Sequence, residues 1–70
     1  MRVYVNDPAR LEELQAALRE ASCISVPIDD GTLDVTHPSA LDEREALIEL
    51  SFFLRAWQAG RPGALVTLDL

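Results

Sequence analysis

Apolar and polar residues alternate in four short stretches of the chain, and apolar residues recur every three or four positions in two longer ones. The alternating stretches cover residues 2–5, 22–28, 32–37 and 64–70, and the helical spacing covers residues 8–21 and 39–59. Alternation predicts strands, whereas the three-to-four spacing predicts helices. The order strand, helix, strand, strand, helix, strand predicts one α+β domain spanning residues 1–70. We expect a ferredoxin-like β-α-β-β-α-β two-layer sandwich, with an antiparallel sheet of order 4-1-3-2 and both helices on one face.

Residues typical of helix ends precede both helical stretches. Asp7 is suited to cap the first helix, with Pro8 at its first position, where a missing N–H costs nothing. Ser39, three residues before Asp42, resembles a capping box for the second helix. We therefore expect the second helix to begin near Ser39 and to run to about Ala59.

The dipeptide Asp30-Gly31 predicts a tight hairpin between the second and third strands. A two-residue turn fixes the register, because each residue then has a defined partner on the other strand. The predicted pairs are Asp29–Thr32, Ile28–Leu33, Val26–Val35 and Ile24–His37. In this register the apolar residues of the second strand face the helices, while Cys23, Ser25 and Pro27 face the open side of the sheet.

The second helix carries more apolar surface than one contact with the sheet requires. Its core-facing arc consists of Ala46, Leu47, Leu50, Phe53, Leu54 and Trp57. A second arc contains Leu41, Ile48 and Phe52, with Arg44 and Arg55 between the two arcs on one side. Two interpretations stay open: the second arc packs on the first helix or the loops, or it forms a surface for self-association or for a protein partner.

The charge balance narrows the partners that the chain can bind. Twelve acidic residues stand against six basic residues, all of them arginine, which gives a net charge of −6. Such a chain repels nucleic acid and anionic membranes, so we expect neither as a partner. The single cysteine, Cys23, is consistent with a reducing compartment, and we expect a cytoplasmic protein. No stretch has the length and apolar character of a signal peptide or a membrane span.

The residues that could carry catalysis are not expected to converge. The predicted hairpin places Cys23 and His37 on opposite sides of the sheet, which excludes a thiol–imidazole pair and a metal site built on them. His37 is expected to point into solvent. Asp34 and Asp69 are expected about 10 Å apart on the open face, with Arg2 between them as a cross-strand ion pair. We therefore predict no enzyme activity, no metal and no cofactor.

These observations favour a small interaction domain over an enzyme. The first hypothesis is a non-enzymatic module that binds itself or another protein, through Leu41, Ile48 and Phe52 or through the free edge of the fourth strand. The alternative is a domain that senses a small, amino-acid-like metabolite. Its layout is similar to amino-acid-binding regulatory domains of this topology, and its site would use Asn6, Asp7 and Arg10 at the turn between the first strand and the first helix.

Overall fold

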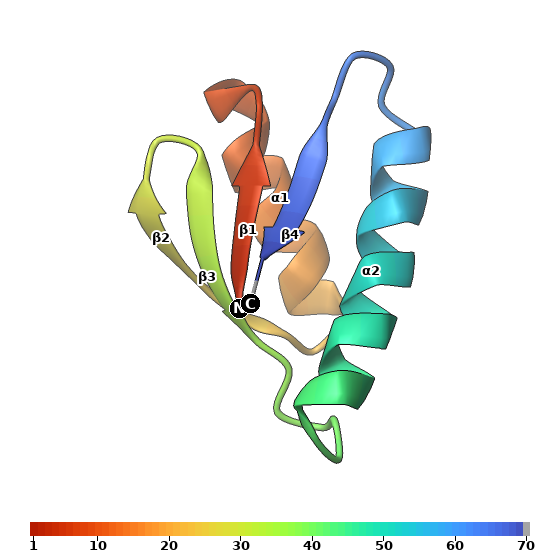
Figure 1. The fold of residues 1–70 in the computed structure, drawn as a ribbon. Helices are drawn as coiled ribbons and strands as arrows, with labels where there is room; N and C mark the ends of the chain where they lie inside the picture. Colours follow the sequence, from red (N-terminus) through yellow and green to blue (C-terminus); the bar gives the residue numbers. More distant parts are fainter. Residues whose placement is uncertain (70) are drawn as a thin grey trace.

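The computed structural model describes residues 1–69 (Figure 1). Its elements are β1 (Arg2–Val5), the 3-10 helix η1 (Pro8–Arg10), α1 (Leu11–Glu20), β2 (Ile24–Asp29), β3 (Thr32–Thr36), α2 (Glu43–Ala59) and β4 (Val66–Asp69). Every predicted element is present, with bounds that differ by a few residues. The predicted fourth strand also included Leu70, which lies outside the described residues.

The strands form one antiparallel sheet in the order β2-β3-β1-β4, which reads 4-1-3-2 from the other edge. The chain is thus an α+β domain with a four-stranded antiparallel sheet and two helices. One face of the sheet packs against both helices, and the other is left uncovered (Figure 1). The buried residues that join the two layers are Val3, Val5, Leu14, Leu18, Leu33, Val35, Leu50, Leu54 and Trp57.

Carboxylates cap both helical segments. Asp7 accepts a hydrogen bond from the Ala9 amide at 3.0 Å and Pro8 occupies the first position, as predicted. The second cap differs from the prediction. The cap is Asp42 and not Ser39: its side chain accepts a hydrogen bond from the Glu45 amide at 2.8 Å. The helix α2 therefore begins at Glu43, a few residues after the predicted start near Ser39. A carboxylate at this position also opposes the positive end of the helix dipole, which a serine hydroxyl cannot do.

The predicted register of the hairpin is correct only next to the turn. Asp29 pairs with Thr32, but beyond it a bulge at Ile28 shifts the pairing by one residue. The observed pairs are Pro27–Leu33, Val26–Asp34, Ser25–Val35 and Ile24–Thr36. Because side chains alternate along a strand, this one-residue shift exchanges the two faces of β2.

Pro27 explains why the bulge is needed. The Val35 amide donates to the Met1 carbonyl, so Val35 directs its backbone groups toward β1, and its neighbour Asp34 directs its own toward β2. In the predicted register Pro27 would face Asp34 and would have to supply an N–H that proline lacks. With the bulge, Pro27 faces Leu33 instead, at a position where no ladder hydrogen bond is required.

Candidate interaction surfaces

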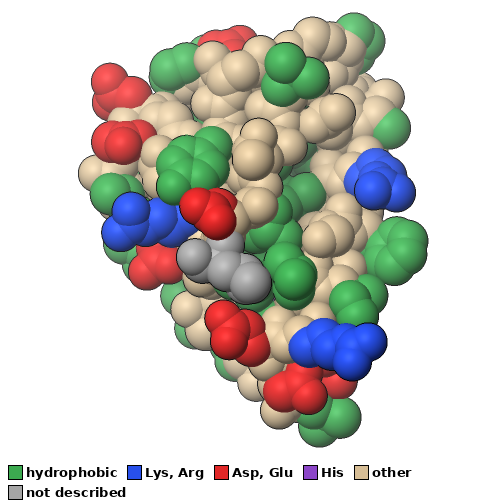
Figure 2. Space-filling model, in the orientation of Figure 1, with side chains coloured by type: hydrophobic (Ala, Val, Ile, Leu, Met, Phe, Trp, Pro, Cys, Tyr) green, Lys and Arg blue, Asp and Glu red, His purple; other side chains and the backbone are tan. Residues whose placement is uncertain are grey.

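The outward side of α2 carries an apolar surface that no other part of the domain covers. We call Leu41, Ile48 and Phe52 the α2 stripe; Ile48 and Phe52 lie on α2, whereas Leu41, predicted within the helix, lies in the turn before the Asp42 cap. Their exposed fractions are 88%, 47% and 68%, so they do not pack on α1 or on the loops. In Figure 2, hydrophobic and basic side chains stand out along the side of the molecule that α2 forms. Of the two interpretations of this arc, the structure therefore excludes burial within the domain.

Charges of opposite sign flank the α2 stripe on its two sides. On an ideal helix, Arg44 and Arg55 lie about 40–60° to one side of the line between Ile48 and Phe52. Glu45 and Glu49 lie about 40–80° to the other side. Neither arginine forms an ion pair within residues 1–69. The exposed apolar residues thus lie between a basic and an acidic border.

A second apolar surface lies on the open face of the sheet, where the bulge has placed it. We call Tyr4, Ile24, Val26 and Ile28 the sheet patch. Its three aliphatic residues were predicted to face the helices, and each is instead about half exposed. The opposite holds for Cys23, which was predicted on the open face of the sheet and is instead buried in the core. Arg2 lies between the two aspartates, as predicted, since it is the cross-strand neighbour of both Asp34 and Asp69, but within residues 1–69 it forms no ion pair with either of them.

Cys23 and His37 lie close together, contrary to the prediction. Both line a small cavity of about 300 Å³, together with Glu49 and Phe53. His37 does not point freely into solvent, because its side chain is only 12% exposed and its Nε2 lies 2.6 Å from Glu49 Oε2. The reversed face of β2 brings the thiol to this side of the sheet. The cavity therefore gathers a thiol, an imidazole and a carboxylate that the predicted register kept apart.

The electrostatics of this cavity oppose nucleophilic chemistry. Burial raises the pKa of the Cys23 thiol, and the Glu49 carboxylate raises it further. The Cys23 thiol donates to the Ala21 carbonyl, with a separation of 3.8 Å. A reactive cysteine needs a lowered pKa, because the thiolate is the nucleophile. The contact between His37 and Glu49 instead joins the end of β3 to α2.

We expect the Cys23 thiol of the folded protein to react with a disulfide reagent at least about tenfold more slowly than the same thiol in urea. Because the pKa of the Cys23 thiol is higher in the folded than in the unfolded protein, deprotonation of this thiol destabilises the fold. The stabilising effect of the protonated thiol is complete below the unfolded pKa and is lost as the pH rises through the folded pKa. Cys23→Ser gives the baseline for both measurements. Equal reaction rates for folded and unfolded protein would contradict this description.

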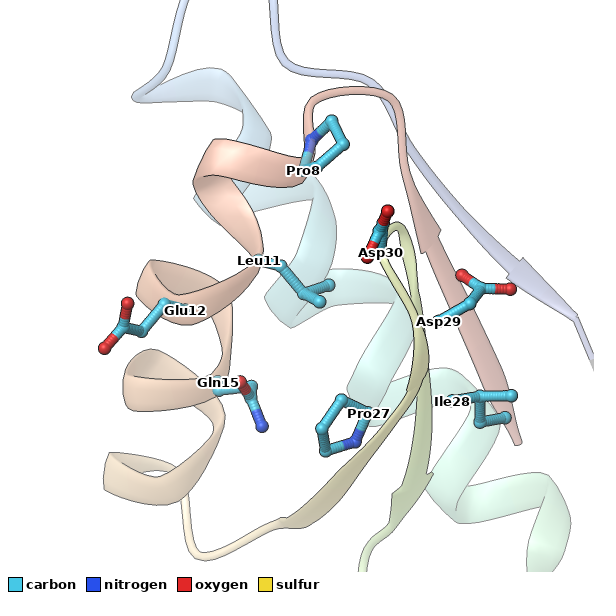
Figure 3. Close-up of a pocket in the computed structure, with 8 residues that line it drawn as sticks. All are labelled: Pro8, Leu11, Glu12, Gln15, Pro27, Ile28, Asp29 and Asp30. Atoms are coloured by element: carbon cyan, nitrogen blue, oxygen red, sulfur yellow. The ribbon is translucent and has the colours of Figure 1, made fainter.

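A shallow groove of about 500 Å³ separates α1 from the tip of the hairpin. Figure 3 shows Leu11 and Pro27 pointing into this space, while Glu12 points away from it and Ile28 and Asp29 project to the other side of the hairpin. Asp29 is engaged in the turn, where its Oδ1 accepts the Gly31 amide at 3.0 Å. This hydrogen bond is the main cause that lowers the pKa of Asp29. The carboxylates around the groove therefore do not converge on a ligand.

The residues of the predicted metabolite site have partners within the domain. Asn6 accepts the Leu65 amide at 2.8 Å and donates to the Gly63 carbonyl at 3.0 Å. Asp7 caps the first helical turn, and its other oxygen lies 3.9 Å from Arg10 Nε. These contacts tie the turn after β1 to the segment before β4. Only Pro8 of this turn lines the groove beside α1.

The two free edges of the sheet offer few backbone groups to an added strand. The Asn6 amide donates to the Leu65 carbonyl, so the backbone groups of Leu65 point toward β1. Because backbone groups alternate in direction along a strand, those of Val66 point away from β1, on the outer edge of β4. There the Val66 amide already donates to Gln58 Oε1 at 2.8 Å. On β2, the outer edge lacks a donor at Pro27. Strand addition at β4, one of the two predicted interaction modes, would therefore have to displace Gln58.

Neither a metal centre nor a membrane span is found in the described part of the chain. Within residues 1–69, no three His, Cys, Asp or Glu side chains are placed so that they could hold a metal ion. No helix in the same range has the length and apolar character needed to cross a bilayer. No protein-family model matches the chain, and no curated protein or solved structure shows significant similarity to it.

Proposed function

We propose that this chain is a non-enzymatic protein-interaction module that associates with a second copy of itself through the α2 stripe. One observation carries the proposal: Leu41, Ile48 and Phe52 stay exposed although the domain has a complete core without them. Exposed apolar residues bordered by charge are typical of protein interfaces. The largest of them, Phe52, belongs to a residue type that is enriched at interface centres.

The charges beside the stripe favour a copy of the chain over an unrelated partner. A helix face with a basic border on one side and an acidic border on the other can pair with itself, because each border then finds its opposite on the second copy. The net charge of −6 favours a basic partner for most of the surface, but not for this face. The α2 stripe is the surface at which two acidic chains can meet with balanced charges.

The fold supports this function without determining it. We infer that the domain is a ferredoxin-like split β-α-β sandwich, because the element order and the sheet order are those of that fold. The fold itself hosts many functions, so the assignment to interaction rests on the surface. The shallow, open cavities and the protonated thiol of Cys23 support a role other than catalysis. No observation favours the metabolite-sensing alternative, because Asn6, Asp7 and Arg10 already have partners within the domain.

Light scattering over a dilution series tests the proposed association. We expect the molar mass to rise from the 7.7 kDa of one chain toward twice that value. An interface of one helix face is small, so we expect a Kd of about 10–100 μM. Ile48→Asp should weaken association by at least about 100-fold, because dimerisation would bury an unpaired carboxylate.

Ile24→Asp is the matched control, because Ile24 is exposed to a similar degree but lies on the sheet patch. This variant adds the same charge and should leave the dimer intact. Circular dichroism should show that both variants fold. A wild type that stays at one chain mass up to about 1 mM would overturn the proposed association. If the two variants weakened association equally, the interface would not lie on the α2 stripe.

A further inference from the structure

We propose that the sheet patch is a second binding surface, and that it fits a basic amphipathic helix from another protein. The site lies on the face of the sheet opposite to both helices, so it is separate from the α2 stripe. It goes beyond the proposed self-association and does not depend on it. The reversed face of β2, the contacts around Thr32 and the charges along the border of the patch support this site.

The sheet patch is built on a row of exposed aliphatic side chains along β2, with Tyr4 on the same face of β1. Ile24, Val26 and Ile28 follow one another along the open face of β2 and are 57%, 56% and 48% exposed. Thr32, on the adjacent strand β3, faces the same side but is only 6% exposed. Its cross-strand neighbours are Tyr4 and Asp29. The low exposure of Thr32 shows that side chains close over β3 at this point, with Tyr4 on one side and Asp29 on the other.

Carboxylates predominate at the border of this surface. Asp29 and Asp30 lie at the hairpin tip, and Asp34 pairs directly with Val26. Asp69 extends the same row beyond Arg2. The nearby positive groups are Arg2 and the terminal amine, which lies 3.6 Å from Asp34 Oδ1. Four carboxylates against two cations leave a net negative border, which complements a partner that carries lysine or arginine beside its apolar residues.

The same charges argue against a second copy of the chain on this face. Packing two sheet patches face to face would bring two acidic borders together, and like charges at an interface are unfavourable. A strand added at the edge of β2 would meet Pro27, which supplies no amide donor. A helix laid across the face needs no backbone hydrogen bonds from the sheet. Covering an open sheet face with a helix is also the usual way in which such layers bury their apolar side.

A synthetic 18-residue helix of leucine and lysine, with leucine along one face, is the probe for this site. Titration into protein with labelled methyl groups should shift the signals of Ile24, Val26 and Ile28. Val26→Ser removes apolar area without changing the charge and should weaken binding about tenfold. Ile48→Ser makes the same kind of change on the α2 stripe and should leave the affinity within about twofold.

A peptide with the same composition but scrambled order separates apolar docking from attraction by charge alone. We expect the scrambled peptide to bind at least about tenfold more weakly than the amphipathic helix. Ile24→Ser provides a second variant at the same face and should behave as Val26→Ser does. Equal binding of the two peptides would overturn the proposal, as would methyl shifts confined to α2 or unchanged affinity in both serine variants.

Discussion

Replacing Leu50 with alanine is expected to lower the free energy of unfolding by about 2–5 kcal/mol. Leu50 is 1% exposed and lies where α2 packs onto the sheet. The substitution removes buried methyl groups and leaves a cavity that the surrounding side chains fill only in part. A domain of this size is stable by only about 4–10 kcal/mol. Urea denaturation should therefore show that the variant has lost a large part of its stability.

Phe52→Ala is the matched control, because Phe52 lies on the same helix but faces outward. Its side chain is mostly exposed, so the substitution should cost less than about 1 kcal/mol in the monomer. Both variants should be measured well below the Kd of the dimer, so that dissociation does not contribute to the result. If Phe52→Ala destabilised the monomer as much as Leu50→Ala does, the α2 stripe would belong to the core.

The charges beside the α2 stripe predict how two helices pair. In a two-fold dimer with parallel α2 helices, the basic border of one copy faces the acidic border of the other. Arg44 then lies near Glu45 of the second copy, while Glu49 stays in contact with His37 of its own domain. In an antiparallel dimer the two basic borders face each other, as do the two acidic borders, and Arg44 lies near Arg55 of the second copy. The parallel arrangement is thus favoured by attraction and the antiparallel one disfavoured by repulsion.

Arg44→Glu is expected to weaken the dimer by about five- to thirtyfold at low salt, because two ion pairs become repulsive contacts. The effect should shrink as salt is added. An antiparallel dimer predicts the opposite sign, since the new glutamate would attract Arg55 of the other copy. Sedimentation equilibrium measures the two Kd values directly. A tighter dimer for Arg44→Glu would show that the helices pair antiparallel, whereas an absent dimer in the wild type would remove the proposed association itself.

The order of elements could be predicted because short-range signals agree along the chain. Asp7 and Pro8 mark the start of the first helix, and the Asp30-Gly31 turn correctly pairs Asp29 with Thr32. The strands could then be ordered from topology. The faces of β2 could not be predicted from its apolar alternation, because that alternation assumes an unbroken ladder. The signal that was missed is Pro27, two residues before Asp29, where a regular hairpin requires an amide donor.

The error in the predicted register of β2 led to two errors about the candidate sites. The predicted register places Cys23 and His37 on opposite sides of the sheet, although both line one cavity with Glu49. It also places Ile24 and Val26 in the core, so the sheet patch is not predicted. The outward position of Ile48 and Phe52, in contrast, follows from the helical period and needs no register, whereas Leu41 lies before the helix that was predicted to include it. Helical spacing placed Ile48 and Phe52 outside the core-facing arc, but only the packed structure shows that they are exposed and not packed on α1 or the loops.

The most direct test of the central claim is to compare amide spectra of the ¹⁵N-labelled wild type at high and low concentration. We expect concentration-dependent shifts at residues 41–59, largest around Ile48 and Phe52, with the amides of β2 and β4 unchanged. This pattern would place self-association on the α2 stripe without any substitution. Spectra that stay the same across the dilution series, or shifts confined to a sheet edge, would contradict the account.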